Sequence, residues 1–134
     1  MTQSTQLAVN GTLMRGLVLN DNLLDAGARF IKDDKTAPCY RLWSINDQHP
    51  AMIRTTDGTG TSVALEVWDI PLVGLASVLA KEPPGLTIGK VVLADDTVVL
   101  GVVGEPFLVQ GQREITEFAG WREYTDALAK GDKS

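Results

Sequence analysis

One glutamate, Glu82, has the setting that proton-transfer chemistry requires. It lies at the end of an apolar segment with helical spacing and is followed by Pro83-Pro84-Gly85, which stops a helix. A carboxyl that is partly withdrawn from water has a raised pKa and can serve as a general acid or base. Glu82 is therefore the candidate catalytic residue. The alternative is a solvated glutamate beside Lys81, the usual situation of this residue type.

The segment from Asn10 to Gly16 brings two glycines into a turn after an apolar stretch. In such a turn, backbone N–H groups can point at an anion such as a substrate carboxylate. The candidate substrate-binding residues here are Asn10, Gly11, Thr12 and Leu13. The alternative is structural, because strand exits often use glycine.

Arg41 and Tyr124 are two further candidates for substrate binding. Arg41 could hold a carboxylate through two parallel hydrogen bonds. The alternative is structural, because strand arginines are more often exposed and paired with a neighbour such as Glu66. The Tyr124 hydroxyl could close a pocket, or it could pin the last helix to the sheet.

Other catalytic chemistry has little support in the sequence. The lone histidine, His49, lies in a polar segment beside Pro50 and is interpreted as a surface residue. Cys39 has no second cysteine to pair with and is interpreted as a small buried apolar residue. One His and one Cys cannot supply the ligands of a zinc site, and no glycine-rich phosphate loop occurs. We therefore expect no metal and no cofactor.

Composition narrows the class of protein further. The 134 residues are 44% hydrophobic, which predicts one domain over 1–134 with its core at about 7–128. A net charge of −5 argues against a nucleic-acid partner. No apolar run reaches the roughly 20 residues that cross a bilayer, and no secretory signal opens the chain. With a lone cysteine, this predicts a cytoplasmic location and no membrane partner. The length leaves no room for a whole amidase.

The elements that must position these residues are short and separated by turn residues. Asn20 or Asp21 is expected to cap a helix that continues through Ile31 into the charged run 32–35. Pro71 is expected to open a second helix, and the two ends, 1–6 and 130–134, are expected to be frayed. Strands are predicted at 7–13, 40–45, 51–54, 63–70, 91–93 and 98–103, and a last helix at 115–128. The order β-α-β-β-β-α-β-β-α predicts an α+β fold, a mixed and barrel-like sheet with flanking helices.

Four blocks of the sequence, in order and spacing, resemble the C-terminal domain of allophanate hydrolase. They are Thr36–Leu42, Leu65–Pro71, Leu86–Asp95 and Ile115–Tyr124. The resemblance spans about Leu7 to Tyr124. It implies a fold similar to the gamma-glutamylcyclotransferase family, a mixed β-barrel with flanking helices, in agreement with the element order.

The resemblance also implies roles for individual residues. In that hydrolase a separate amidase domain with a Ser-Ser-Lys arrangement cleaves allophanate, and the C-terminal domain helps N-carboxycarbamate lose carbon dioxide, with a histidine of its first turn implicated. Thr12 stands at that place here. The cyclotransferases instead use a glutamate after the corresponding helix, where Glu82 falls, and hold the substrate carboxylate with the first turn. Asn10 replaces the tyrosine that usually opens that turn.

Three functions therefore remain open. The chain could be a stand-alone domain that binds a small carboxylated or amide-containing metabolite and assists its decarboxylation or amide turnover in urea and allophanate nitrogen metabolism. It could be a non-catalytic accessory subunit of a separate amidase. It could be a cyclotransferase-like enzyme that uses Glu82. A pocket that joins Gly11 to Glu82 favours the first or the third.

Overall fold

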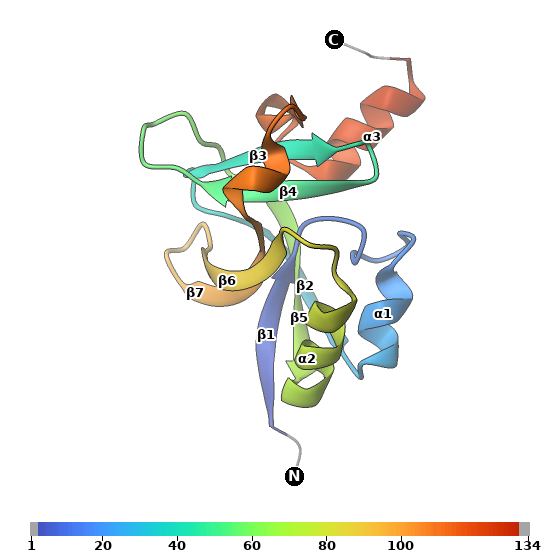
Figure 1. Ribbon diagram of the computed structural model, residues 1–134. Coiled ribbons are helices and arrows are strands. Elements are labelled where there is room, and N and C mark those ends of the chain that lie inside the picture. The colour runs from blue at the N-terminus through green and yellow to red at the C-terminus, as the bar shows by residue number, and fades with distance from the viewer. Residues whose placement is uncertain (1–2, 132–134) are drawn as a thin grey trace.

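The computed structural model describes residues 3–131, which form two β-sheets and three α-helices (Figure 1). One sheet has five strands in the order β2-β5-β1-β7-β6, and the other has three in the order β4-β3-β8. The elements are β1 (Ser4–Val9), α1 (Asn20–Asp25), β2 (Arg29–Lys35), β3 (Tyr40–Ile45), β4 (His49–Arg54), β5 (Ala64–Pro71), α2 (Leu72–Lys81), β6 (Leu86–Val92), β7 (Val98–Gly104), η1 (Pro106–Val109), β8 (Arg113–Glu114), η2 (Thr116–Phe118) and α3 (Trp121–Ala129).

Strand β1 is the centre of the larger sheet. It runs antiparallel to β5 and parallel to β7, so that Leu7 pairs with both Trp68 and Leu100. Consecutive buried residues at Leu7, Ala8 and Val9 show that both faces of the strand are covered at this end. The turn that follows β1 therefore starts from the middle of the core. The first residues of β1, expected to be frayed from 4 to 6, are paired with β5.

The prediction of a helix from Asn20 into the charged run 32–35 is wrong beyond Asp25. Helix α1 ends at Asp25, and Gly27 has a φ of +83°, a conformation that breaks the helix. The chain then forms β2, which pairs antiparallel with β5 and packs Phe30 edge-to-face on Trp68. The charged residues of β2 lie on an exposed edge strand, where they discourage pairing with other chains. Tertiary pairing with β5 thus overrides the local helical spacing.

Helix α2 agrees with the prediction at both ends. It starts directly after Pro71 and ends at Lys81, before Glu82-Pro83-Pro84. It packs closely on α1, because a Cβ placed on Gly74 would lie 2.3 Å from the Ala26 carbonyl oxygen. The start of α2 is therefore held against the end of α1.

The last predicted helix begins later than expected. Residues 115–118 belong to the chain around β8 and η2, and α3 starts at Trp121 after Ala119 adopts a φ of +58°. Strand β8, which the sequence did not indicate, adds an edge to β3.

The predicted α+β class, with helices flanking mixed sheets, is confirmed, while the two sheets of the described chain do not join into a closed barrel. Strand β4 of the smaller sheet packs against β7 of the larger one. Among residues 3–131, no helix is long and apolar enough to cross a membrane.

Candidate functional site

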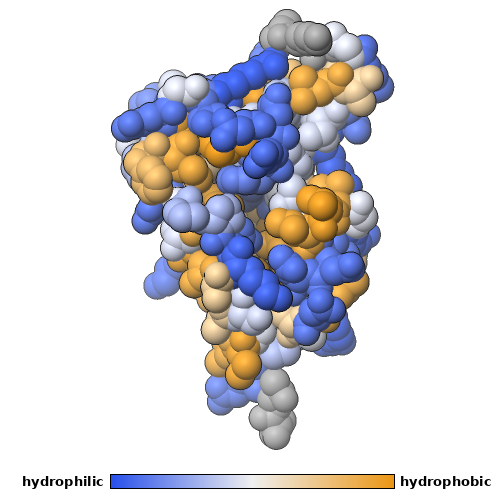
Figure 2. Space-filling view, turned by 45° about the vertical axis from the view of Figure 1, so that its right-hand side comes forward, coloured by the Kyte–Doolittle hydropathy of each residue, from blue (hydrophilic) through white to orange (hydrophobic). Residues whose placement is uncertain are grey.

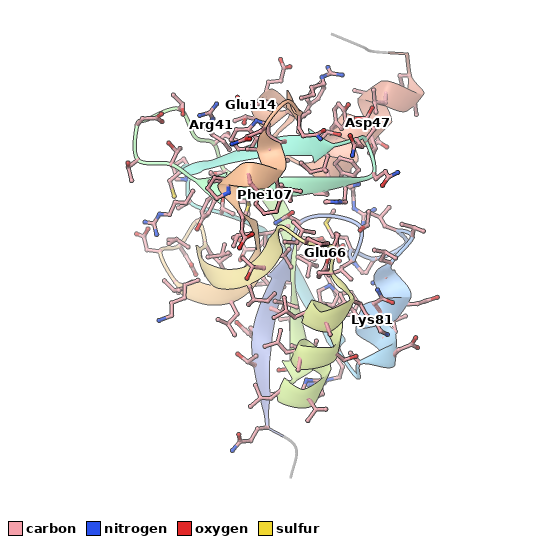
Figure 3. The ribbon with its side chains drawn as sticks, viewed as in Figure 1. Arg41, Asp47, Glu66, Lys81, Phe107 and Glu114 are labelled. Atoms are coloured by element: carbon pink, nitrogen blue, oxygen red, sulfur yellow. The ribbon has the colours of Figure 1, made fainter. Side chains whose placement is uncertain are left out.

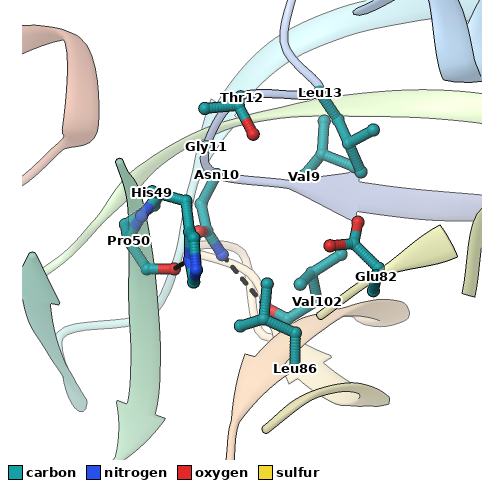
Figure 4. Close-up of a pocket in the computed structure, with 10 residues that line it drawn as sticks. All are labelled: Val9, Asn10, Gly11, Thr12, Leu13, His49, Pro50, Glu82, Leu86 and Val102. Atoms are coloured by element: carbon teal, nitrogen blue, oxygen red, sulfur yellow. Dashed lines mark hydrogen bonds between the residues drawn. The ribbon is translucent and has the colours of Figure 1, made fainter. Parts of the chain in front are cut away.

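A small pocket lies where the two sheets and the end of α2 meet (Figure 4). Its cavity volume is about 20 Å³. The inner part is thus just large enough for about one small group. The lining residues come from β1 and its turn, β4, the end of α2, β6 and β7: Val9, Asn10, Gly11, Thr12, Leu13, His49, Pro50, Glu82, Leu86 and Val102. Five of the seven residues singled out from the sequence lie in this set.

The turn after β1 presents unpaired backbone donors. Within residues 3–131, no acceptor is found for the N–H groups of Gly11, Thr12 and Leu13. Their carbonyl groups are used instead: Met14 N–H donates to Gly11 (3.0 Å), Leu19 N–H donates to Thr12 (3.0 Å), and the Asn20 side chain donates to Leu13 (2.8 Å). Buried N–H groups without an acceptor are rare in proteins. Here Gly11 and Thr12 are half-buried and Leu13 is buried, and three successive N–H groups without an acceptor, in residues that line a pocket, suit a carboxylate ligand.

Gly11 is required at its position by close packing. A Cβ on this residue would lie 2.5 Å from Cδ of Pro50, so the turn and β4 can approach only if the side chain is absent. This contact fixes the distance between the turn and β4 across the pocket.

Asn10 is nearly buried, with 4% of its surface exposed, and it ties three strands together. Its Nδ2 donates to the Val102 carbonyl oxygen (3.0 Å) and contacts the Met52 sulfur (3.7 Å). The amide nitrogen is therefore committed to the fold, and the side-chain oxygen is the atom left for a ligand.

Glu82 extends into the pocket from the residue after α2, between Val9, Leu13, Leu86 and Val102 (Figure 4). Burial among these apolar side chains raises the pKa of its carboxyl. Within the described chain the carboxyl has no ion pair and no hydrogen bond. A polar group that is partly buried and has no protein partner is available to a ligand.

His49 also lines the pocket, although the sequence placed it on the surface. It opens β4 beside Pro50, and its Nδ1 lies 3.1 Å from the Pro50 carbonyl oxygen. A carbonyl oxygen only accepts, so Nδ1 is the donor in this contact, and Nε2 has no hydrogen bond within the described residues. No local signal marked this residue, because its position depends on how β4 is placed against the turn after β1.

Arg41 and Tyr124 do not line the pocket. Figure 3 shows Arg41 beside Glu114 at the smaller sheet. Arg41 forms a bidentate ion pair with Glu114, with nitrogen–oxygen distances of 2.9 and 2.5 Å. This pairing lowers the pKa of the Glu114 carboxyl.

Tyr124 is fully buried on α3 and donates a hydrogen bond to the carboxylate of Asp47 at 2.5 Å. Asp47 lies in the turn between β3 and β4 and also accepts from Ser44 at 2.6 Å. The hydrogen bond from Ser44, followed by that from Tyr124, lowers the pKa of Asp47, and burial raises the pKa of Tyr124. Tyr124 thus pins α3 to the smaller sheet.

A buried carboxylate, Glu66, holds the chain that follows the turn. It is 1% exposed and accepts hydrogen bonds from the Arg15 backbone N–H (2.9 Å), Arg15 Nε (3.0 Å) and Trp68 Nε1 (3.0 Å). Arg122 of α3 donates to the same carboxylate at 3.2 Å and to the Arg15 carbonyl oxygen at 2.5 Å. The turn is therefore fixed at its far end by β5 and α3.

Metal-ligating side chains do not gather anywhere in the described part of the chain. No group of three or more His, Cys, Asp or Glu residues is close enough there to hold an ion. The chemistry of the pocket rests on backbone N–H groups, one carboxyl and one imidazole.

Comparisons with known proteins agree with this architecture. A crystal structure of a uropathogenic E. coli-specific protein has 56% identity and a TM-score of 0.90, covering 92% of this chain and 97% of that one. Allophanate hydrolase from Kluyveromyces lactis has 30% identity and a TM-score of 0.89, covering 94% of this chain and 22% of that one. Urea amidolyase from Lachancea kluyveri is 29% identical over 93% of this chain. The chain spans about 7% of the length of the curated relatives that it matches.

A more distant neighbour shows the fold alone. An AIG2-like protein from Mus musculus has 20% identity and a TM-score of 0.59 over 80% of this chain and 83% of that one. The gamma-glutamylcyclotransferase-like fold expected from the sequence is confirmed at this level. The family model for the allophanate hydrolase C-terminal domain matches residues 5–126, and the chain belongs to that family.

Proposed function

We propose that the pocket binds a small metabolite that carries a carboxylate beside an amide or carbamate nitrogen, and that Glu82 exchanges a proton with it. The observation that carries this proposal is the partnerless Glu82 carboxyl in the same pocket as the unpaired N–H groups of Gly11, Thr12 and Leu13. Unpaired donors attract the carboxylate, and a carboxyl with a raised pKa supplies the proton.

The reaction that fits this arrangement is a decarboxylation at nitrogen. The turn holds one carboxylate of an N-carboxylated carbamate, and neutral Glu82 donates its proton to the nitrogen. As the C–N bond breaks, its electron pair stays on nitrogen and carbon dioxide leaves. Glu82 is left ionised and regains a proton from water. Nε2 of His49 accepts a hydrogen bond from the substrate and helps to orient it.

Two alternatives have a specific observation behind them. Release of 5-oxoproline from a gamma-glutamyl amine uses the same pair, an acid and a carboxylate-binding turn, and Glu82 after α2 favours it. An accessory role beside an amidase is favoured by the relatives, since the domain is one part of multidomain urea amidolyase and allophanate hydrolase. For each of these functions, the single Cys39 suits a reducing cytoplasm.

Binding is tested with malonate, in which a methylene replaces the nitrogen between two carboxylates. The amide resonances of Gly11, Thr12 and Leu13 should shift on titration, and those of Arg41 and Tyr124 should not. Malonate that leaves the turn resonances in place, while gamma-glutamyl amines also fail to move them, overturns the binding proposal.

Proton transfer is tested with Glu82→Gln and the matched control Glu117→Gln, an exposed glutamate in η2. N-Carboxycarbamate is generated in place by a separate amidase acting on allophanate, and release of carbon dioxide is followed. Glu82→Gln should lose most of the acceleration, on the order of 100-fold or more, and Glu117→Gln should keep it. Full activity in Glu82→Gln contradicts the proton-transfer role.

A further inference from the structure

A second hollow opens directly outside the pocket. Thr12, His49 and Glu82 line both, so the two spaces share a wall that carries the reactive groups. The outer hollow has a cavity volume of about 170 Å³, against about 20 Å³ for the inner pocket. A substrate larger than the inner pocket must therefore extend into the outer hollow.

The outer hollow has apolar walls. Besides the shared residues it is lined by Val18, Leu19, Gln48 and Pro83. Val18 is 82% exposed and Leu19 is 38% exposed, and Figure 2 shows hydrophobic surface on the side of the molecule where the chain before α1 comes forward. None of the residues that line this hollow is Lys or Arg. An uncharged, apolar group therefore fits it better than a second carboxylate.

The apolar wall and the anion-binding turn form one rigid unit. The Leu19 N–H donates to the Thr12 carbonyl oxygen (3.0 Å), and the Asn20 N–H donates to Leu17 (3.1 Å). Because these bonds join the two ends of the same loop, a ligand anchored by its carboxylate at the turn reaches Val18 and Leu19 in a fixed direction. Such preorganisation converts apolar contact into selectivity.

We infer that the outer hollow is a specificity subsite for a short alkyl group carried on the nitrogen of the substrate. This inference rests on the proposed function, since the turn and Glu82 define the polar end of the ligand. Val18 and Leu19 are the residues that select the alkyl group, and burying it against them favours substituted over unsubstituted substrates.

A series of malonate, 2-ethyl-, 2-propyl- and 2-butylmalonate tests the inference, because the 2-position of malonate stands where the substrate nitrogen carries its substituent. Affinity for the natural sequence should tighten about three- to fourfold with each added methylene until the hollow is filled. Val18→Ser and Leu19→Ser should flatten this dependence. Val73→Ser is the matched control, because Val73 is 83% exposed on α2 and does not line the hollow. A flat series for the natural sequence overturns the inference.

Two sets of resonances separate this inference from the proposed function. Malonate that shifts the Gly11 to Leu13 amides while the series stays flat leaves the proposed function standing and removes the subsite. N-Butylacetamide, which has no carboxylate, should shift the methyl resonances of Val18 and Leu19 even if the turn binds nothing. If neither set moves with any probe, both proposals fail.

Discussion

The pocket and the smaller sheet with its covering helix α3 both contain polar residues that the sequence singled out, but these residues are satisfied in opposite ways. On the sheet, Arg41 is paired with Glu114 and Tyr124 with Asp47. In the pocket, Glu82 has no partner in the described chain. Pairing satisfies a polar group within the fold, so the sheet residues hold structure, while the Glu82 carboxyl remains available to a ligand.

The pKa shifts record the same contrast. Hydrogen bonds lower the pKa of Asp47 and Glu114, because they favour the charged carboxylate. Burial without a partner raises the pKa of Glu82, because it favours the neutral acid. A shift toward the neutral form in a pocket is the more useful mark of a proton-transfer site.

The largest expected effect is on the sheet side. Tyr124→Ala removes a buried ring that packs edge-to-face on Phe118, with 5.3 Å between ring centroids, and against Trp121, with 5.7 Å between ring centroids. The free energy of unfolding in urea should fall by about 3–5 kcal/mol, while malonate still shifts the turn amides of the folded protein. If this variant does not fold, Tyr124→Phe, which keeps the ring but loses the hydrogen bond to Asp47 and the one from Arg113, should lose about 1–3 kcal/mol. Malonate binding lost in Tyr124→Phe would place Tyr124 in the site.

A smaller but double effect is expected at Glu66, which joins the two regions. Glu66→Gln weakens the hydrogen bonds to Arg15 and Arg122, and it should lower the free energy of unfolding by about 1–3 kcal/mol. Hydrogen exchange in the segment from Thr12 to Leu19 should accelerate, because the loop loses its anchor. Unchanged exchange there would mean that Glu66 does not position the turn.

On the pocket side, the expected loss of stability comes from the close packing of Gly11 on Pro50 and not from a lost hydrogen bond. Gly11→Ala forces a Cβ against the Pro50 ring, so we expect a loss of about 1–3 kcal/mol together with weaker malonate binding. Gly89→Ala is the comparison, since its Cβ would meet Val103 at 3.2 Å and should be tolerated better. Equal losses of stability, with malonate binding intact in both, would contradict the role of this contact.

The smallest effects concern pH, and their signs are opposite. The pKa of Glu82 is raised on folding, so its charge opposes folding as pH rises; Glu82→Gln should be slightly more stable than the natural sequence near pH 7 and equal to it near pH 3. The pKa of Asp47 is lowered, so its contribution is present near pH 7 and declines as pH falls through the folded value. Asp47→Asn should therefore lose stability mainly near neutral pH. Urea unfolding at both pH values measures the two differences, and the same sign for both variants would contradict the contrast.

Prolines and glycines, which end helices and form turns, explain what could be predicted from the sequence. Pro71 and Pro83 bound α2, so the position of Glu82 at its end was predictable, and glycines marked the turn at Gly11. Strand β2 was missed because β5, its partner, decides its structure. His49 was missed for a related reason, since it reaches the pocket only through the placement of β4.

The roles of Arg41 and Tyr124 could not be settled locally either. Glu114 and Asp47 are distant in the chain, and only the assembled sheet and α3 bring them into hydrogen-bonding distance. The sequence alone does not show whether a polar side chain has a hydrogen-bonding partner in the folded protein.

The hydrogen bond from Arg122 to the Arg15 carbonyl oxygen determines when the pocket can form during synthesis of the chain. The turn that lines the pocket is synthesised before α3, and β1 can pair with Leu100 only once β7 has been synthesised. Until β7 and α3 have been synthesised, β1 therefore lacks one strand partner and Arg15 lacks its hydrogen bond from Arg122. Binding competence should appear in one late step of synthesis, when α3 closes onto Arg15.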